Sequence, residues 1–567
     1  MFIPTKRRLG EILKDANLIS DQQLQMALEK QKETNERLGK LLVTLGYVNE
    51  TSVIKVLESQ LGIPYINLSK RPIDPEIAKL IPETMAQRYK IIPVTKSPHR
   101  LTLAMVDPLN VFAIDDVRIT TGLEVDPVIA SESDMDRAIS QAFGGKETLE
   151  KLMNDLPEDM ESGDDMELDQ LKELLEDAPI VKLVNSIISK GVLERASDIH
   201  VEPQENELRV RHRVDGVLFD LMSPPKRMQA PIISRIKIMA NLDIAERRVP
   251  QDGRIQMKVE GKEIDLRVST LPTIFGEKVV MRILDKTRGL VKLDNLGLLA
   301  DNLQRFRGVI SQPHGIILVT GPTGSGKTTT LYSVLSSLNT PEKNIITLED
   351  PVEYTLNGVN QVQLNSRAGL SFASGLRSVL RQDPDIIMVG EIRDSETARI
   401  AIQSAMTGHL VLSTLHTNSA AATLARLMDM EVEPFLVSSS VVGIVAQRLV
   451  RALCPDCKVP YQPPEMLHEV MGMDIPEDTV IYQAKGCPLC NGKGYRGRIA
   501  LHEVLVPDAR LRDFIIAKAD ASHIEQAAKM SGMVTLKEDG ILKVLLGLTS
   551  LEEVMRTVHI AETATTM

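Results

Sequence analysis

A glycine-rich loop between an apolar run and a helical stretch limits the folds open to this chain. The run Ile316–Val319 is typical of a buried strand, and Gly321-Pro-Thr-Gly-Ser-Gly-Lys-Thr328 follows it at once. A helical pattern then extends from Thr329 to Leu338. Strand, loop and helix in this order indicate a phosphate-binding loop in an α/β domain with a parallel sheet.

The chemistry of this loop predicts a nucleotide and Mg²⁺ as ligands. Its glycines allow consecutive backbone N–H groups to turn inward around a β-phosphate at the start of a helix. Lys327 is expected to reach the β- and γ-phosphate oxygens, and the hydroxyl of Thr328 is expected to bind Mg²⁺. The predicted nucleotide-binding residues are Gly321, Thr323, Gly324, Ser325, Gly326, Lys327, Thr328 and Thr329.

Further strand ends supply candidates for hydrolysis, which requires a carboxylate that orients or deprotonates water. Glu349 ends one apolar run and Glu391 follows another, so both are expected at the carboxyl edge of the sheet, where ligands collect. Gly390 stands where a metal-binding aspartate is common, so we expect Glu391 to reach Mg²⁺ through water. Which glutamate is the general base stays open. A third run ends at His416, for which we expect a phosphate-sensing role.

The length of 567 residues indicates several folded units, because single cores stop growing near about 250–300 residues. Composition and hydrophobic periodicity change along the chain and place the boundaries between them. The expected segments are a helical repeat domain (1–65), a small α/β domain (66–145), an acidic linker (146–178), a second α+β domain (179–290) and the α/β domain with the phosphate-binding loop (291–567).

The net charge of −11 lies almost entirely in the acidic linker. Thirteen carboxylates and three lysines between Lys146 and Asp177 give −10 there, so we interpret this stretch as a solvated linker. The rest of the chain is nearly neutral, with no basic block, no Trp and 3% aromatic residues. Nucleic-acid binding needs phosphate neutralisation and stacking surfaces, so it is disfavoured.

Hydropathy predicts a cytoplasmic protein. No apolar run approaches the roughly 18–20 residues that span a bilayer, and the first residues lack the apolar region of a signal peptide. We therefore expect contact with a membrane to be peripheral only.

All four cysteines belong to one pattern, Cys454-Pro-Asp-Cys457 and Cys487-Pro-Leu-Cys490, within a module at 450–500. Two such pairs suit tetrahedral thiolate ligation of Zn²⁺, and in a cytoplasmic protein a metal is favoured over disulfides. Four thiolates leave no open coordination position, so the predicted zinc is structural. The alternative is a reduced, metal-free pair of turns.

Two copies of a helical unit open the chain, each spanning 24 residues. Apolar positions spaced three and four residues apart predict stacked helical pairs. One interpretation is a small helical docking domain. The matching positions are Arg8, Leu9, Gly10 and Gln31 in the first copy and Arg37, Leu38, Gly39 and Gln60 in the second.

In combination, these features resemble the ATPases of the type II/type IV secretion superfamily. Besides the loop and the cysteines, the resemblance rests on Thr347-Leu-Glu-Asp-Pro-Val-Glu353, on Thr407-Gly-His409 through His416-Thr417, and on Ala196-Ser-Asp-Ile-His-Val-Glu-Pro203. It covers nearly the whole chain, and the motors that extend type IV pili fit best within the superfamily. It implies an α/β multidomain fold in which ATP lies between a PAS-like domain (179–290) and a RecA-like ATPase domain.

The resemblance also implies roles for individual residues of the α/β domain. Glu349 falls in the acidic box of the superfamily and Glu391 in its Walker B segment. His409 and His416 belong to its histidine box.

Four arginines are further candidates by the same resemblance. Arg267 and Arg282 match arginines that reach the nucleotide from the PAS-like domain, and Arg381 and Arg498 are additional phosphate-facing candidates. The amino-terminal repeats resemble a module that binds cyclic di-GMP in some of these ATPases.

As a member of this superfamily, the chain is expected to form a homohexameric ring at the inner membrane. Hydrolysis would change the angle between the two ATP-clamping domains, and the ring would pass this motion to an inner-membrane platform protein that adds pilin subunits. A type II secretion ATPase, which drives pseudopilus growth, has the same motifs and stays an alternative.

Two rivals come from other functional classes. A RecA-like nucleic-acid translocase conflicts with the charge and the aromatic content of the chain. A purely structural nucleotide-binding scaffold is disfavoured because Glu349, Glu391 and His416 are all predicted at one sheet edge.

Overall fold

The computed structural model describes residues 9–16, 18–34, 38–49, 52, 54, 56, 58, 61–68, 73–143, 178–259, 261–285, 290–462 and 479–558. The chain forms two compact units. Residues 1–212, 219–255 and 268–281 belong to the first, and residues 213–218, 256–267 and 282–567 belong to the second. The finer division into five segments stays a prediction.

The helices near the amino terminus include α1 (Leu9–Asp15), α2 (Asp21–Thr34) and α3 (Leu38–Thr44). They agree with the helical periodicity of the sequence. Their small apolar core buries Leu13, Ala27 and Leu42. A side chain at Gly10 would place its Cβ 2.6 Å from Cδ1 of Leu24, so the side chain of Leu24 would have to shift to admit it.

Residues 73–143 fold around a three-stranded sheet in the order β1-β2-β3. The first pair is antiparallel and the second is parallel, with α7 as the crossover connection. The apolar runs at 91–94 and 101–105 each predict a short strand, and both strands are present. The elements are α5 (Pro75–Ala78), α6 (Glu83–Tyr89), β1 (Ile91–Lys96), β2 (Arg100–Met105), α7 (Val111–Thr121), β3 (Glu124–Ile129) and α8 (Glu132–Phe143).

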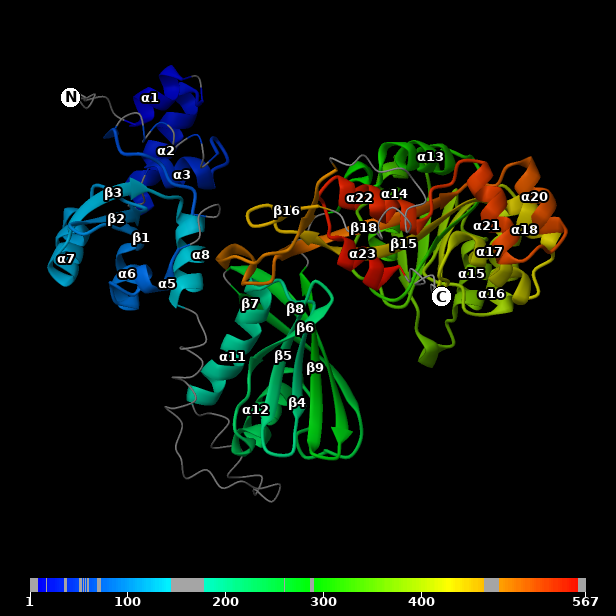
Figure 1. Ribbon diagram of the computed structural model, residues 1–567, viewed down its shortest axis with the longest axis horizontal. Coiled ribbons are helices and arrows are strands. Elements are labelled where there is room, and N and C mark those ends of the chain that lie inside the picture. Colours follow the sequence, from blue (N-terminus) through cyan, green and yellow to red (C-terminus); the bar gives the residue numbers. More distant parts are fainter. Residues whose placement is uncertain are drawn as a thin grey trace. The chain divides into compact units, whose positions relative to one another are not determined.

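The middle of the chain forms a six-stranded sheet in the order β6-β5-β4-β9-β8-β7. Residues 208–214 alternate between buried and half-buried positions, as their sequence pattern predicts. Figure 1 shows α11 and α12 together on one side of this sheet. The elements are α11 (Ala178–Leu193), β4 (Asp198–Pro203), β5 (Leu208–Val214), β6 (Val217–Met222), the 3₁₀ turn η1 (Lys226–Met228), α12 (Gln229–Met239), β7 (Gln251–Val259), β8 (Lys262–Thr273) and β9 (Gly276–Asp285).

A seven-stranded sheet forms the core of the second unit, in the order β12-β11-β13-β14-β10-β15-β18. Neighbouring strands are parallel except β15 and β18. The predicted parallel α/β sheet is thus confirmed. Its elements up to β15 are η2 (Leu293–Asn295), α13 (Ala300–Ile310), β10 (Gly315–Thr320), α14 (Lys327–Leu338), β11 (Ile345–Glu349), β12 (Asn360–Gln363), η3 (Ser366–Ala368), α15 (Phe372–Val379), β13 (Ile386–Val389), α16 (Ser395–Met406), β14 (Leu410–Leu415), α17 (Ala420–Asp429), α18 (Pro434–Ser440) and β15 (Val441–Leu453).

Helices cover both faces of this sheet, which explains why β10 is apolar at successive positions. Ile316 and Leu318 join a core with α15–α18, while Ile317 and Val319 join a core with α13 and α14. All six residues of β10 are buried. The strand that precedes the phosphate-binding loop is therefore held rigidly inside the sheet.

The chain between β15 and β18 carries the cysteines and a two-stranded ribbon of β16 (Val459–Tyr461) and β17 (Ile481–Gln483). Four helices follow β18, and each begins after a side chain that accepts a hydrogen bond from a backbone N–H of the first turn: Asp508, Asp520, Thr535 and Ser550. The elements are η4 (Pro488–Cys490), β18 (Tyr495–Leu505), α20 (Ala509–Ile516), α21 (Ala521–Met530), α22 (Leu536–Leu545) and α23 (Leu551–Thr557).

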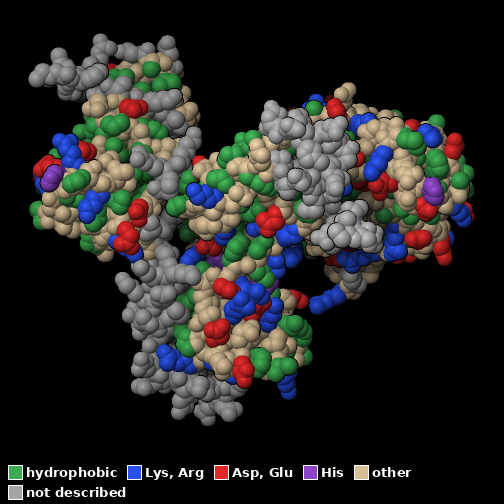
Figure 2. Space-filling model, viewed as in Figure 1, with side chains coloured by type: hydrophobic (Ala, Val, Ile, Leu, Met, Phe, Trp, Pro, Cys, Tyr) green, Lys and Arg blue, Asp and Glu red, His purple; other side chains and the backbone are tan. Residues whose placement is uncertain are grey.

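Charged side chains of both signs are interspersed on the face shown in Figure 2, including the region over α18 and α20. This distribution differs from the stripe of basic residues that tracks a nucleic-acid backbone.

Candidate active site

The phosphate-binding loop leaves the carboxyl end of β10 and leads directly into α14. Gly324 and Gly326 have φ of +80° and +90°, which only glycine adopts without strain. Gly326 is the N-cap of α14 and has no side chain to bond the free N–H groups of the first turn. Those N–H groups are therefore open to an anion, as the loop pattern predicts.

Lys327 lies in the first turn of α14 and its Nζ donates to the carbonyl oxygens of Gly321 and Pro322, at 2.8 and 3.1 Å. Burial lowers the pKa of Lys327, the charge of Glu391 opposes this shift, and the charge of Arg448 adds to it. Lys327 thus already lies among the charged groups of the sheet edge.

The hydroxyl-bearing residues of the loop differ in exposure. Thr323 and Thr328 are exposed, Thr329 is half-buried, and Ser325 is buried at 3% exposure. Thr328 is therefore placed where its hydroxyl is accessible at the helix start, while Ser325 faces the protein interior.

Glu391 and His416 meet at the carboxyl edge of the sheet. Oε2 of Glu391 lies 3.4 Å from Nε2 of His416, and Oε1 lies 2.6 Å from Nη2 of Arg393. The side chain of Glu391 is 15% exposed and that of His416 is 49% exposed. The structure therefore brings together Lys327, Glu391 and His416, which the sequence predicted at this edge.

Glu349 lies at the same edge but is enclosed, with 3% exposure. Its carboxylate accepts hydrogen bonds from Thr347 Oγ1 at 2.6 Å, from Gln361 Nε2 at 3.0 Å and from the hydroxyl of Tyr332. Burial, followed by the bond to Glu349, raises the pKa of Tyr332. Three donors thus hold Glu349 in the protein interior.

His409 and Arg381 lie away from this group within the chain. His409 precedes β14 whereas His416 follows it, so the two histidines stand at opposite sheet edges. Nδ1 of His409 lies 2.9 Å from the carbonyl oxygen of Ser404. Arg381 follows α15 and donates to the carbonyl oxygen of Arg377 at 2.8 Å.

The remaining predicted arginines are Arg267 on β8, Arg282 on β9 and Arg498 on β18. Nη2 of Arg267 lies 3.4 Å from Oε2 of Glu353, which follows Glu349 by four residues. Arg282 is exposed. Nε of Arg498 lies 3.8 Å from Oδ1 of Asp215, which also accepts a hydrogen bond from the N–H of Gly497 at 3.0 Å.

Sequence reasoning missed Gln447 and Arg448 of β15, which border the loop. Nε2 of Gln447 donates to the carbonyl oxygen of Ser325 at 2.8 Å, and Nη2 of Arg448 donates to Oδ1 of Asn418 at 2.9 Å. A signal was present, because two adjacent polar residues interrupt the apolar run Val441–Val450.

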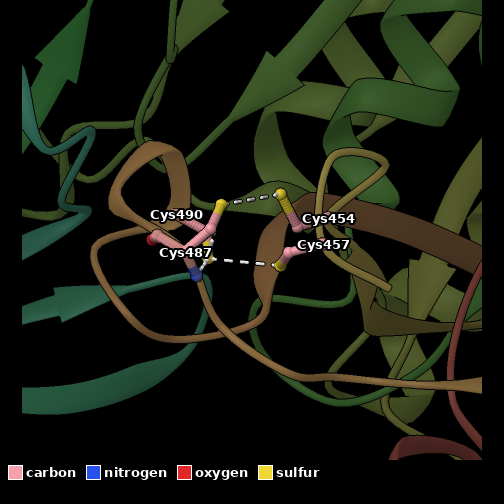
Figure 3. Close-up of side chains that lie close together, drawn as sticks. All are labelled: Cys454, Cys457, Cys487 and Cys490. Carbon is pink, nitrogen blue, oxygen red and sulfur yellow. Dashed lines mark hydrogen bonds between the residues drawn. The ribbon is translucent and has the colours of Figure 1, made fainter. Parts of the chain in front are cut away.

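The four cysteines converge from two turns (Figure 3). Their Sγ atoms all lie within 4.8 Å of one another. The pairs Cys454–Cys487, Cys457–Cys490 and Cys487–Cys490 are 3.9, 3.8 and 3.7 Å apart. Four sulfurs around a zinc ion at about 2.3 Å would be about 3.8 Å apart, so the cluster has the size that a tetrahedral Zn²⁺ site requires.

Of the residues predicted to bind cyclic di-GMP, Arg8, Arg37 and Gln60 lie outside the described residues. Leu9 belongs to α1, and Gly10 is buried. The other three residues of the prediction are half-buried: Gln31, Leu38 and Gly39. The structure thus leaves this site as a prediction.

Two protein-family models match the chain. The model described as "Type II/IV secretion system protein" matches residues 173–556, which include the loop, both glutamates and the cysteines. The model described as "MshEN domain" matches residues 61–149, which include the three-stranded sheet.

Two curated relatives align over almost the full length. The chain is 48% identical over 558 residues to the "Type IV pilus assembly ATPase PilB" of Myxococcus xanthus, covering 97% of this chain and 98% of that protein. It is 46% identical over 560 residues to the "Type II secretion system protein E" of Xanthomonas campestris pv. campestris, covering 97% and 98%.

A solved structure shares the fold. The chain matches the Legionella pneumophila ATPase DotB with a TM-score of 0.50 and 22% identity, over 66% of this chain and 95% of that one. Among the described residues, no helix is both long enough and apolar enough to cross a membrane.

Proposed function

Because the chain belongs to the type II/IV secretion system protein family, we propose that it is an ATP-hydrolysing motor that drives the polymerisation of pilin subunits in type IV pilus extension. The resemblance recognised in the sequence is confirmed by the family model and by the full-length relatives. ATP hydrolysis is the activity of this family, so the chain is an enzyme. The step to pilin rests on the 48% identity to a pilus assembly ATPase.

The observation that carries the proposal is the meeting of Lys327, Glu391 and His416 at one sheet edge. Nζ of Lys327 is bonded to two loop carbonyls. ATP phosphates offer stronger, charged acceptors, so they exchange with these carbonyls when the nucleotide binds. Thr328 would hold Mg²⁺ at the helix start, and the ion would supply positive charge to neutralise the phosphates.

In this proposal Glu391 is the general base, and it alone accepts the proton from water. Its carboxylate is partly exposed and lies 3.4 Å from His416 Nε2, where it can receive a proton from water. Glu349 supports the site differently: its oxygens are taken up by Tyr332, Thr347 and Gln361. We assign it to holding the sheet edge in shape.

Arg267 and Arg282 complete the site in the same proposal. Guanidinium groups at the γ-phosphate stabilise charge in the transition state. Arg267 is paired with Glu353 at 3.4 Å, so it already stands close to the segment that follows Glu349. Arg381 and Arg498 are proposed to contact phosphates only when the assembly brings them near a nucleotide.

The cysteine cluster is proposed to hold one structural Zn²⁺ through Cys454, Cys457, Cys487 and Cys490. The cluster contains four thiols, so a bound zinc has no open position for a substrate. Its role is to fix the two turns that connect β15 with β18.

We further propose a homohexamer that acts in the cytoplasm, docked peripherally at the inner membrane on a platform protein. The amino-terminal repeats are proposed to bind cyclic di-GMP through the residues named in the sequence analysis, and the "MshEN domain" match at 61–149 adjoins them. A plain docking domain is the alternative for this segment.

The direct test combines enzymology with a strain that lacks the gene. Purified chain should hydrolyse ATP in the presence of Mg²⁺, and the deletion strain should lack surface pili until the native gene, but not a Lys327→Ala copy, is returned. Normal pili together with lost protein secretion would identify the type II secretion alternative, which the 46% identical relative favours. Strong stimulation of turnover by DNA or RNA would point instead to a nucleic-acid translocase.

A further inference from the structure

Strand β15 carries a buried glutamine directly beside the phosphate-binding loop. Gln447 is 3% exposed and its neighbours along the strand, Val445 and Ala446, are buried and apolar. A polar side chain is costly in such a strand unless both its donor and its acceptor are bonded. The hydrogen-bond partners of the Gln447 side chain therefore indicate which part of the structure this residue holds in place.

Both polar atoms of the Gln447 amide form hydrogen bonds, one with the loop and one with α14. Nε2 donates to the carbonyl oxygen of Ser325 at 2.8 Å, and Oε1 accepts from Oγ1 of Thr330 at 2.7 Å. Ser325 lies within the loop and Thr330 lies in the first turns of α14. The carbonyl oxygen can only accept, so this bond also fixes which way the amide faces.

The loop also approaches the backbone of β15 closely. A Cβ at Gly321 would lie 2.4 Å from the carbonyl oxygen of Gln447, and a Cβ at Gly326 would lie 2.8 Å from its Nε2. Both contacts are too short for a side chain. Two glycines of the loop are thus required by β15 as well as by the phosphates.

We propose that Gln447 is a positioning residue for ATP. By holding the carbonyl of Ser325 toward β15, it turns the following N–H groups, those of Gly326 and Lys327, toward the phosphates. It touches no reacting atom itself. The inference rests on the proposed ATPase function and assigns a residue that sets the geometry of that site.

The adjacent residue extends this role to the other side of the site. Nη2 of Arg448 donates to Oδ1 and to the carbonyl oxygen of Asn418, at 2.9 and 3.2 Å. Asn418 follows His416 by two residues. One strand therefore anchors both the phosphate-binding loop and the loop that carries the histidine.

Three variants in the full-length chain test the role of Gln447. Gln447→Leu removes both bonds, Thr330→Val removes only the bond to Oε1, and Thr330→Ser keeps the hydroxyl. Removing one buried hydrogen bond of this kind changes an equilibrium by about tenfold. We expect at least that rise in the ATP KM and in the ADP dissociation constant for Gln447→Leu, a smaller rise for Thr330→Val, and near-native values for Thr330→Ser.

The matched control is Ser404→Ala, which removes a buried hydroxyl that bonds to the carbonyl oxygen of Ile400 within α16. It should lower the melting temperature without changing KM or the ADP dissociation constant. The double variant Gln447→Leu with Thr330→Val should match Gln447→Leu alone, because the two residues share one bond.

Native nucleotide constants in folded Thr330→Val and Gln447→Leu would overturn the inference, as would a loss of thermal stability alone. If Gln447→Leu does not fold, the comparison of Thr330→Val with Thr330→Ser still tests the inference. Only a positioning role makes the ATP KM of these two variants differ. Absence of ATP turnover in the native chain would instead overturn the proposed function, and ADP calorimetry would still test the positioning role.

Discussion

Glu349 and Glu391 both belong to the same sheet edge, but their surroundings differ. Three donors bond to the carboxylate of Glu349, which is 3% exposed. Glu391 is 15% exposed and contacts two basic side chains, Arg393 and His416. A base must exchange a proton with water, so the more exposed carboxylate of Glu391 suits that role, while the enclosed carboxylate of Glu349 suits a structural one.

This difference predicts unequal effects of two isosteric changes. Glu391→Gln should keep ATP binding and lower turnover by about 10²-fold or more, because an amide cannot serve as a base. Glu349→Gln should reduce thermal stability and affect turnover less. Steady-state hydrolysis and ATP calorimetry measure the two effects, with Glu396→Gln, an exposed residue in the first turn of α16, as the matched control. If Glu349→Gln lost more turnover than Glu391→Gln, Glu349 would be the base and Glu391 the structural carboxylate.

At the scale of elements, β15 and β18 connect the nucleotide site with the cysteine cluster. Gln447 borders the loop, and Cys454 follows the end of the same strand. β18 returns from the second cysteine pair and is antiparallel to β15, with Gln447 opposite His502. The cysteine module is thus continuous with the sheet through two long strands.

Zinc removal should therefore act on this module first. We expect one zinc per chain by elemental analysis, and we expect Cys487→Ser to lose the metal and to expose residues 450–500 to proteolysis, because ligation energy is part of the folding energy of such modules. ATP affinity should change little. A folded, protease-resistant module that contains no zinc would contradict the assignment.

His502 predicts a pH dependence for the same pair of elements. It is fully buried on β18, and burial, reinforced by the charge of Lys543, lowers its pKa to about 3. An unfolded imidazole titrates near 6.5, so the unfolded state takes up a proton first as the pH falls. Stability supplied by neutral His502 is complete above about pH 6.5 and is lost between that pH and about 3.

We expect His502 to lower the free energy of unfolding by about 2 kcal/mol at pH 5 relative to neutral pH. Thermal unfolding of the full chain with and without His502→Phe measures it, because Asp539 and Glu503 titrate in both proteins. The variant should lose less stability on acidification. If the stability of the two proteins fell in parallel with pH, protonation of His502 would not destabilise the folded chain, and the prediction would be wrong.

At the scale of the molecule, we propose that the arginines of the six-stranded sheet couple hydrolysis to domain motion. Arg267 is paired with Glu353, a weak surface contact of 3.4 Å between half-exposed groups. Such a pair is readily exchanged for a phosphate. Arginines supplied by a separate sheet would make turnover depend on the approach of the two ATP-clamping domains.

Mixed assemblies test this coupling. Arg282→Ala should fold and bind ATP while turnover falls by about 10³-fold, the scale of an arginine that stabilises phosphoryl transfer. If the arginine acts across subunits, mixing Arg282→Ala with Lys327→Ala chains should restore part of the activity at interfaces that pair the intact residues. Turnover within a few-fold of native in Arg282→Ala would leave both arginines as surface residues.

The sequence alone was sufficient for features encoded in contiguous residues. The phosphate-binding loop, the cysteine pairs and the strands at 91–94, 101–105 and 208–214 each follow from local pattern, because loop chemistry and side-chain alternation depend on near neighbours. The parallel sheet followed as well, since apolar runs alternate with helical stretches.

Only the tertiary structure separated residues that look alike in the sequence. His409 and His416 flank one strand and so lie at opposite edges, and Glu349 differs from Glu391 because Tyr332 and Gln361 fold over it. Gln447 meets Ser325 across 122 positions of sequence. Burial and hydrogen-bond partners of this kind come from distant segments, so no local pattern contains them. They are what distinguishes the proposed base, the proposed structural carboxylate and the proposed positioning residue.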